Sequence, residues 1–202
     1  MANMDERISY LHEQKKTIIL SIDGNIGSGK STLVRNLQQH YQDNYRICFL
    51  EEPVSIWETI TDLSGNNILK NYYENQKKYA FPFQMMAYIS RLTLLRKALT
   101  KNYDVIITER CVYTDKMVFA KMLYDSNKIE QIEYSIYNLW FDEFIKDLPD
   151  FYFVYVQTMP EIADERVLAR SRPGEIIPLE YLKDCNKYHE NWLSNINPKK
   201  LL

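Results

Sequence analysis

The feature that most constrains this sequence is a glycine-rich stretch, GNIGSGKST, directly after the apolar run at residues 17–22. It fits the pattern G-x-x-x-x-G-K-[ST] through Gly24, Gly29, Lys30 and Ser31. Glycines allow backbone N–H groups to curl around phosphate oxygens, and the N-terminus of a following helix adds partial positive charge. Lys30 is expected to reach the β- and γ-phosphates, and Ser31 to hold Mg²⁺. The stretch therefore predicts a nucleoside triphosphate site.

Apolar runs and helical patterns alternate along the rest of the chain. The expected strands are short and show little polar alternation, which is typical of parallel strands buried on both faces. These expected strands are residues 17–22, 46–50, 105–108 and 151–157, and the expected helices are residues 31–42, 83–100, a pair within 115–146, 161–170 and 179–194. This order predicts an α/β fold, a doubly wound parallel sheet flanked by helices, with ligands at the carboxyl ends of the strands. The closing NPKKLL looks like the start of a last strand, so we expect about five strands, the last incomplete.

Composition limits the partners of the protein. The chain of 202 residues fits one domain, and its net charge of −2 lacks the basic excess that nucleic-acid binding needs. No apolar run is long enough to span a membrane, and the first residues lack the apolar core of a signal peptide. The 3 cysteines are widely spaced and match neither a zinc pattern nor a disulfide framework. We therefore expect a cytoplasmic protein that binds neither nucleic acid nor membranes.

Two adjacent carboxylates, Glu51 and Glu52, open the stretch EEPVSIW after the second expected strand. Pro53 stiffens the turn, and Trp57 follows one helical turn later. A carboxylate aimed at a ligand from such a turn would accept a proton, whereas a carboxylate on the surface would be without chemical role. The residues alone leave both readings open.

A second carboxylate follows the strand of YDVIITER, where Glu109 and Arg110 stand side by side. Glu109 is suitably positioned to hold Mg²⁺ through water, although a local salt bridge explains the pair equally well. In FPFQMMAYISRL, the helix spacing brings Gln84, Ala87 and Arg91 to one face, as a polar notch or as a solvated stripe.

The motifs taken together resemble those of the deoxyribonucleoside kinases, the group that contains deoxycytidine, deoxyguanosine and mitochondrial thymidine kinases. GNIGSGKST, EPVSIW, FPFQ, ER followed by Asp115, and IPLEYL occur in the family's order. The resemblance implies a P-loop NTPase-type fold and the transfer of the γ-phosphoryl group of ATP to the 5′-hydroxyl of a deoxyribonucleoside, with Mg²⁺, in nucleotide salvage. It also implies a homodimer and feedback inhibition by a deoxynucleoside triphosphate.

The resemblance extends to the donor side of the site. The stretch ERVLARSRPGE matches a lid with arginines, at about residues 166–176, that closes over the triphosphate. A solvated basic helix end is the alternative reading. The expected donor-binding residues are Gly24, Asn25, Ile26, Gly27, Ser28, Gly29, Lys30, Ser31, Thr32, Arg166 and Arg170, and the expected metal ligands are Ser31 and Glu109.

On the acceptor side, Glu52 matches the family's general base, which takes the proton of the 5′-hydroxyl. Tyr73 matches the tyrosine that binds the sugar 3′-hydroxyl, with Glu175 as its acidic partner, and Phe119 matches the ring that stacks on the base. The expected acceptor-binding residues are Glu52, Val54, Trp57, Tyr73, Phe83, Gln84, Ala87, Arg91, Arg110, Asp115, Phe119 and Glu175. Catalysis is assigned to Glu52, Arg110, Lys30, Arg170 and Arg172.

The base preference follows from Arg91 and Asp115, which match a pair found in deoxycytidine and deoxyguanosine kinases. Thymidine-preferring relatives have small or apolar residues there, so we expect deoxycytidine or purine deoxynucleosides to be favoured. One alternative is a nucleoside monophosphate kinase of the thymidylate type, which would need a further arginine for the acceptor phosphate. A second alternative is a P-loop switch, but DLSG at residues 62–65 follows no strand and NKIE at residues 127–130 ends in Glu.

Overall fold

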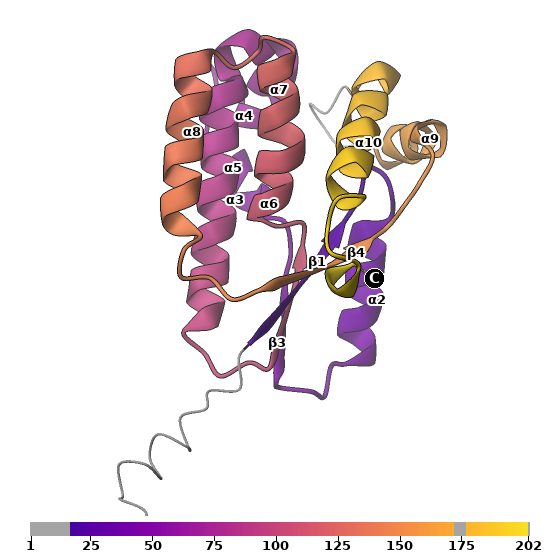
Figure 1. Cartoon of the computed structure of the whole chain (residues 1–202). Coiled ribbons are helices and arrows are strands. Elements are labelled where there is room, and N and C mark those ends of the chain that lie inside the picture. The colour runs from indigo at the N-terminus through magenta and orange to yellow at the C-terminus, as the bar shows by residue number, and fades with distance from the viewer. Residues whose placement is uncertain (1–16, 172–176, 202) are drawn as a thin grey trace, which may run out of the picture.

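The computed structural model describes residues 17–171 and 177–201, which fold around a 4-stranded sheet (Figure 1). Its strands are β1 (Ile18–Asp23), β2 (Ile47–Leu50), β3 (Val105–Glu109) and β4 (Phe151–Tyr155). They lie in the order β2-β3-β1-β4, and every pair is parallel. The carboxyl ends of all the strands therefore meet at one edge, as predicted for this fold class.

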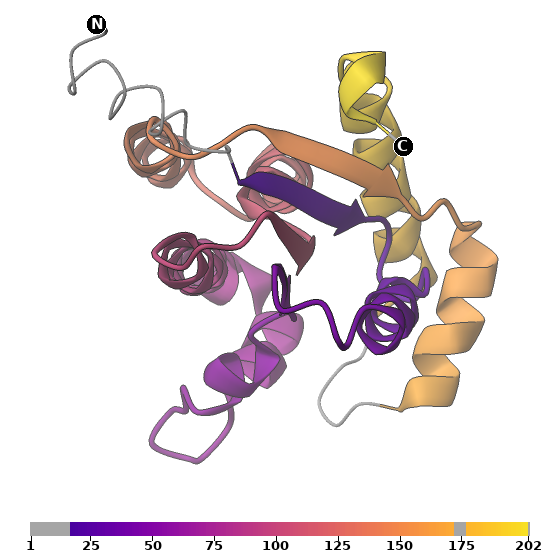
Figure 2. The same ribbon diagram turned by 90° about the horizontal axis from the view of Figure 1, so that it is seen from below.

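Alternate residues of the strands face two different helical layers. Ile19 of β1 packs in a core cluster with residues of α5 (Gln76–Leu99) and α8 (Gln131–Phe144). Ile22 points the other way, against Val34 of α2 (Lys30–His40). Figure 2 shows α2 on one side of the strands and α5 and α8 on the other. Because both faces are covered, the strands are apolar with little alternation.

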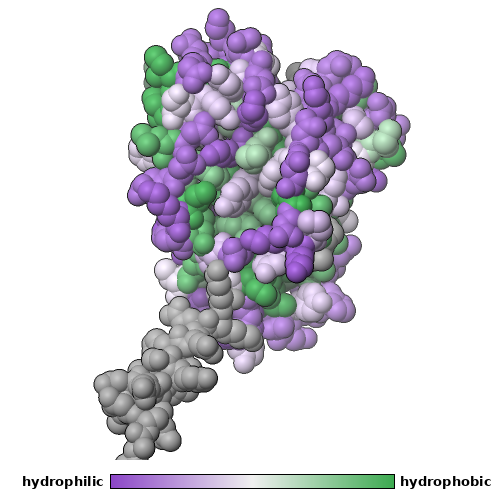
Figure 3. All heavy atoms as spheres, viewed as in Figure 1, coloured by the Kyte–Doolittle hydropathy of each residue, from purple (hydrophilic) through white to green (hydrophobic). Residues whose placement is uncertain are grey.

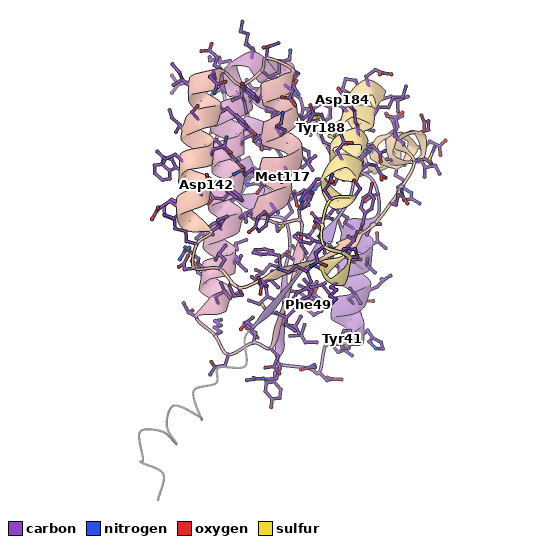
Figure 4. The ribbon with its side chains drawn as sticks, viewed as in Figure 1. Tyr41, Phe49, Met117, Asp142, Asp184 and Tyr188 are labelled. Atoms are coloured by element: carbon purple, nitrogen blue, oxygen red, sulfur yellow. The ribbon has the colours of Figure 1, made fainter. Side chains whose placement is uncertain are left out.

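The other helices surround the carboxyl edge of the sheet. They are α3 (Val54–Glu58), α4 (Ile68–Glu74), α6 (Val112–Thr114), the π-helix η1 (Asp115–Ala120), α7 (Lys121–Asp125), α9 (Pro160–Arg170), α10 (Leu179–Leu193) and the 3₁₀ turn η2 (Pro198–Lys200). Helix α10 lies against α7, where the hydroxyl of Tyr188, labelled in Figure 4, donates to Asp125 Oδ2 at 2.7 Å.

Two helical segments differ from the sequence-based expectation. Helix α5 begins at Gln76 instead of residue 83, and Pro82 lies inside it. Proline is unusual inside a helix because it removes a backbone hydrogen bond, so the sequence pattern gives no reason to extend the helix before Pro82. The π-helix η1 interrupts the first part of the helical pair expected within residues 115–146, and α3 and α4 are too short to give a clear periodic pattern.

The predicted last strand is reduced to one contact. After η2, Leu201 forms a single parallel bridge with Phe153 of β4. The expectation of about five strands is thus met by 4 strands in the described residues and this bridge at the edge of β4.

Figure 3 shows hydrophilic residues, in purple, along α7 and α10 on this face of the molecule. Residues of intermediate and hydrophobic character, in white and green, lie in the furrow between the two helices. In residues 17–171 and 177–201, none of the helices combines the length and the apolar character that a membrane span requires.

Candidate active site

One cavity of about 620 Å³ opens where β1, β2 and β3 end. Its walls come from the glycine loop after β1, from the ends of β2 and β3, and from α4, α5, η1 and α9. The sequence-predicted residues that line it are Ile26, Gly27, Gly29, Lys30, Ser31, Thr32, Glu52, Val54, Trp57, Tyr73, Phe83, Gln84, Ala87, Arg91, Glu109, Arg110, Asp115, Phe119, Arg166 and Arg170. The predicted donor side and acceptor side therefore share one cavity.

Three predicted donor residues of the loop, Gly24, Asn25 and Ser28, are not among the described residues that line the cavity. Asn25 Nδ2 donates to the carbonyl oxygen of Leu182 at 2.9 Å and so ties the loop to α10. Gly24 has a φ of 146°, and a Cβ there would lie 2.5 Å from the carbonyl oxygen of Val156. Asn25 and Gly24 therefore fix the loop against α10 and the segment after β4.

Lys30 is the first residue of α2 and is only 4% exposed. Its Nζ turns back to the carbonyl oxygen of Asn25 at 2.6 Å. Burial lowers the pKa of Lys30 to about 7, and the nearby Arg110 guanidinium lowers it further against the pull of Glu109 and Glu52. An anionic ligand in the loop would raise the pKa of Lys30 again, because a nearby negative charge favours the charged ammonium.

The hydroxyl of Ser31 donates to Glu109 Oε1 at 2.7 Å, which joins the start of α2 to the end of β3. A hydroxyl and a carboxylate side by side are hard oxygen donors, the kind that Mg²⁺ prefers together with phosphate oxygens and water. The two predicted metal ligands thus fit a magnesium site beside the phosphate loop.

Glu52 follows β2 and is held by two arginines. Its Oε1 accepts hydrogen bonds from Arg110 Nη1 at 2.8 Å and from Arg91 Nη2 at 3.1 Å. Burial alone would raise the pKa of Glu52, but Arg110, Arg91 and Lys30 together lower it to about 2. Glu52 is therefore an ionised, inward-facing carboxylate, whereas the neighbouring Glu51 is exposed.

Arg91 on α5 connects three parts of the cavity. Besides the bond to Glu52, its Nε donates to Asp115 Oδ2 at 3.0 Å and its Nη1 to the carbonyl oxygen of Glu109 at 2.9 Å. Burial raises the pKa of Asp115, although Arg91 opposes this. The Arg91–Asp115 pair was predicted from the family resemblance. The bond from Arg91 to Glu52 was not, because nothing local in the sequence connects α5 to the end of β2.

The inner end of the cavity has flat aromatic walls. The rings of Trp57 and Phe83 meet edge to face at 5.5 Å, and the Arg110 guanidinium lies 5.2 Å from the centre of the Phe119 ring. Gln84 is 2% exposed, and its Oε1 has no hydrogen-bond partner within the described part of the chain. This end can hold a flat ring with a polar edge, since an amide there can both donate and accept.

Arginines of α9 approach the loop from the other side. Arg166 Nη1 donates to the carbonyl oxygen of Ser28 at 3.1 Å, and Arg170 also lines the cavity. The other predicted lid residues, Arg172 and Glu175, lie outside the described residues.

Several lining residues were missed by the sequence reasoning: Val34, Arg35, Glu51, Ser55, Leu69, Tyr72 and Tyr181. The hydroxyls of Tyr72 and Tyr181 share a hydrogen bond of 2.8 Å that joins α4 to α10. Tyr181 belongs to the motif IPLEYL, which was the one available signal; Tyr72 had none apart from its neighbour Tyr73.

A phosphate loop that faces a buried carboxylate and an aromatic pocket across one cavity is the arrangement of a P-loop kinase for small molecules. Comparison with known sequences narrows this class. The model of the deoxynucleoside kinase family matches residues 20–202, and the chain belongs to that family. It is therefore an enzyme that phosphorylates deoxynucleosides with ATP as phosphate donor, which confirms the resemblance carried by the motifs.

Individual relatives agree with the family match. The chain is 36% identical over 196 residues to the probable deoxycytidine kinase of fowlpox virus (strain NVSL), covering 95% of this chain and 77% of the relative. It is 34% identical to human deoxycytidine kinase, covering 86% and 74%. It is 31% identical to the mitochondrial deoxyguanosine kinase of Xenopus laevis, covering 87% and 72%.

Proposed function

We propose that this kinase phosphorylates the 5′-hydroxyl of deoxycytidine and of purine deoxynucleosides in preference to thymidine. The observation that carries the proposal is the position of Glu52, which shares one cavity with Lys30 of the phosphate loop and with the Arg91–Asp115 pair. A hydroxyl between Glu52 and the loop faces a proton acceptor on one side and a triphosphate on the other. Relatives named deoxycytidine kinase and deoxyguanosine kinase support deoxycytidine and deoxyguanosine as substrates.

The proposed reaction is an in-line displacement. The 5′-oxygen forms a bond to the γ-phosphorus of ATP, the bond from that phosphorus to the bridging oxygen breaks, and ADP leaves. Glu52 takes the proton of the hydroxyl. Such a transfer depends on alignment and on charge neutralisation more than on a strong base. Arg110 is suited to neutralising charge on the moving phosphoryl group, since its Nε and Nη2 have no hydrogen-bond partner within the described residues.

The donor is held by the loop from residue 24 to residue 32 and by arginines from α9. Lys30 contacts the β- and γ-phosphates, and Arg166, Arg170 and Arg172 neutralise charge from the lid side. Ser31 and Glu109 would hold Mg²⁺, which, when bound, offsets charge on the β- and γ-phosphate oxygens. The 2.7 Å bond between these two side chains supports that pairing.

The acceptor lies in the aromatic end of the cavity. Trp57, Val54, Phe83 and Ala87 form the apolar walls, and Phe119 stacks on the base. The amide of Gln84 reads the base edge, because its buried oxygen and nitrogen match complementary groups on a ring. Tyr73, with Glu175, binds the 3′-hydroxyl of the sugar.

The Arg91–Asp115 pair carries the base preference. Both side chains are buried, at 7% and 2% exposure, so they occupy space that the 5-methyl group of thymine would need. A fixed guanidinium–carboxylate pair also offers a polar wall to the amino groups of cytosine and adenine, whereas a methyl group there would be poorly matched.

A coupled assay of ADP release across the four deoxynucleosides and their 5′-monophosphates tests the proposal. Release with deoxycytidine, deoxyadenosine or deoxyguanosine and much less with thymidine is the expected result. Release with monophosphates alone would assign the protein to the thymidylate-type kinases instead, and the absence of acceptor-dependent release would contradict any kinase role for the site.

A homodimer through α8 is part of the proposal. Ile132, Ile136, Leu139 and Trp140 are 40% to 72% exposed and recur at helical spacing, so they form one apolar stripe. Phe141, on the opposite side of the helix, is core. Light scattering should give the mass of a dimer for the wild type and of a monomer for Leu139→Lys.

The shape of the cavity supports feedback inhibition as a further part of the proposal. Phosphate loop and nucleoside pocket are continuous, so a deoxynucleoside triphosphate can lay its base in the aromatic end and its phosphates on the loop. Such a product would compete with both substrates at once. Competitive inhibition by deoxycytidine triphosphate against both ATP and deoxycytidine is the expected pattern.

We further propose one folding domain in a reducing compartment such as the cytoplasm. The helices of both layers pack on one sheet, which supports a single cooperative unfolding transition. Cys48, Cys111 and Cys185 are free thiols, and the last two are buried. Calorimetry and cell fractionation test these two points.

A further inference from the structure

A buried hydrogen bond ties the end of β1 to α6. The hydroxyl of Thr114 donates to Asp23 Oδ1, and both residues are 0% exposed. The oxygen of the same hydroxyl accepts the backbone N–H of Cys111 at 3.1 Å. One side chain therefore joins three segments: the end of β1, the turn after β3 and the end of α6. We call Asp23, Cys111 and Thr114 the junction.

Each arm of the junction continues into the active site at the next residue. Gly24, the first residue of the phosphate loop, follows Asp23. Arg110, which holds Glu52, precedes Cys111, and Asp115, which holds Arg91, follows Thr114. The donor loop and the two acceptor-side ion pairs are thus anchored to one buried point.

The turn at Arg110 needs such an anchor. Arg110 has a φ of 59°, which lies in the left-handed region. A residue other than glycine adopts this conformation only at a cost in free energy. The bond from the N–H of Cys111 to Thr114 fixes the backbone immediately after this residue. The direction of the Arg110 side chain toward Glu52 therefore depends in part on Thr114.

The junction itself does not touch the ligands. Asp23, Cys111 and Thr114 are absent from the described lining of the cavity. The local contacts of each half-site, such as Lys30 with Asn25 and Arg91 with Asp115, do not include Thr114. Loss of the junction should leave the donor side able to bind ATP and the acceptor side able to bind the deoxynucleoside, but it should alter the position of one side relative to the other.

We propose that Thr114, through Asp23, is a positioning residue for phosphoryl transfer that sets the phosphate loop against the acceptor end of the cavity. This inference rests on the proposed function. In-line transfer is sensitive to such placement, since an error of about 1 Å costs on the order of 10²-fold in rate. A purely structural hydroxyl would change stability and leave turnover of the folded enzyme unaltered.

Three variants separate these readings by steady-state kinetics with deoxycytidine and ATP, together with thermal unfolding. Thr114→Val keeps the shape and removes the hydroxyl, and it should lower kcat about tenfold or more with both KM values within about threefold. Thr114→Ser restores the hydroxyl and should recover kcat to within about threefold. Thr108→Val is the matched control, because Thr108 is a buried threonine of β3 near Cys111 whose hydroxyl has no partner in the described chain.

Wild-type kcat in Thr114→Val, with or without a lower melting temperature, would overturn the proposal, as would an equal loss in Thr108→Val. Should Thr114→Val fail to fold, Asp23→Ala replaces it, because it removes the side-chain oxygen that accepts the hydrogen bond of Thr114. A fall in kcat of about threefold at unchanged KM would support the junction, and an unchanged kcat would overturn it. A wild type inactive on deoxycytidine would instead be a failure of the proposed function.

Discussion

Arg110 donates a hydrogen bond to Glu52 across 2.8 Å, between the segments that follow β3 and β2. In this arrangement Glu52 is ionised at neutral pH, with a pKa of about 2, and so is a weak proton acceptor. Its proton affinity rises when Arg110 turns to the charge on the phosphoryl group, because an opposite charge is then withdrawn. In the mechanism proposed above, the same arginine would therefore restrain Glu52 before transfer and release it as charge develops.

The first prediction concerns Glu52→Gln. The amide can still hold the hydroxyl but cannot take its proton, so kcat should fall by about 10² or more while the dissociation constant of deoxycytidine stays within a few-fold. Single-turnover kinetics and calorimetric titration measure the two quantities. Glu58→Gln is the control, since Glu58 is an exposed carboxylate of α3 that is absent from the described lining of the cavity, and its loss should leave kcat near that of the wild type. Similar rates for the two variants would remove Glu52 from the reaction.

Replacing Arg91 and Asp115 together by alanine should raise thymidine use relative to deoxycytidine. Absolute rates will fall as well, because Arg91 also holds Glu52 at 3.1 Å, so the quantity to compare is the ratio of the two kcat/KM values. We expect this ratio to rise about tenfold or more, the size of one well-placed steric change.

The control for ion-pair loss on the same helix is Arg96→Ala with Asp147→Ala. Arg96 bonds Asp147 at 2.7 Å on an exposed surface, so this double variant should leave the ratio as in the wild type. An unchanged ratio in the Arg91 and Asp115 double variant would show that the pair does not select the base.

Binding of ATP should take up a proton at alkaline pH. With a pKa of about 7, below the ordinary 10.5, Lys30 is mostly neutral at pH 8 in the free enzyme, whereas the triphosphate favours its charged form. Affinity for ATP should therefore weaken as pH rises above about 7, with an uptake of up to about one proton at pH 8. Calorimetric titrations in buffers of low and high ionisation enthalpy measure this uptake.

The control is Lys30→Arg, whose guanidinium stays charged, so its uptake should vanish. Equal binding heats in both buffers for the wild type at pH 8 would contradict the assigned pKa.

His189 should make the fold sensitive to acid. It is fully buried on α10, and burial lowers its pKa to about 3, against an ordinary 6.5. The folded state therefore binds fewer protons than the unfolded chain below about pH 6.5, and this contribution to stability is lost as pH falls toward 3. From pH 7 to pH 5 the loss is about 2 kcal/mol. In His189→Phe, the change in the free energy of unfolding over this interval should shrink by that amount, as measured by urea denaturation.

The parts of the site that lie in continuous stretches were predictable from the sequence. The phosphate loop and α2 need only local turn chemistry and a helix start, and the order of strands and helices followed from apolar runs. By contrast, the bond between Arg91 and Glu52 joins residues 39 positions apart, and the junction of Thr114 with Asp23 joins residues 91 positions apart. Only the folded sheet brings such distant segments together, so no local sequence pattern predicts these hydrogen bonds.

The helices likewise include features that the sequence predicted and features that it did not. The start of α5 was predicted too late, since a proline such as Pro82 is unusual inside a helix, and the π-helix at Asp115 has no sequence signature of its own. Asp115, which only the family resemblance singled out, nevertheless lines the same cavity as Glu52 and Arg91.

The central claim is that the end of β2 holds the carboxylate that receives the proton of a 5′-hydroxyl. The most direct measurement is a crystal structure with deoxycytidine and ADP, in which the distance from the Glu52 carboxylate to the 5′-oxygen is read. We predict about 2.6–3.2 Å, with the 5′-oxygen turned toward the phosphate loop. A Glu52 carboxylate turned away from that oxygen, or an acceptor that can bind only with a phosphate already on its 5′-oxygen, would contradict the account.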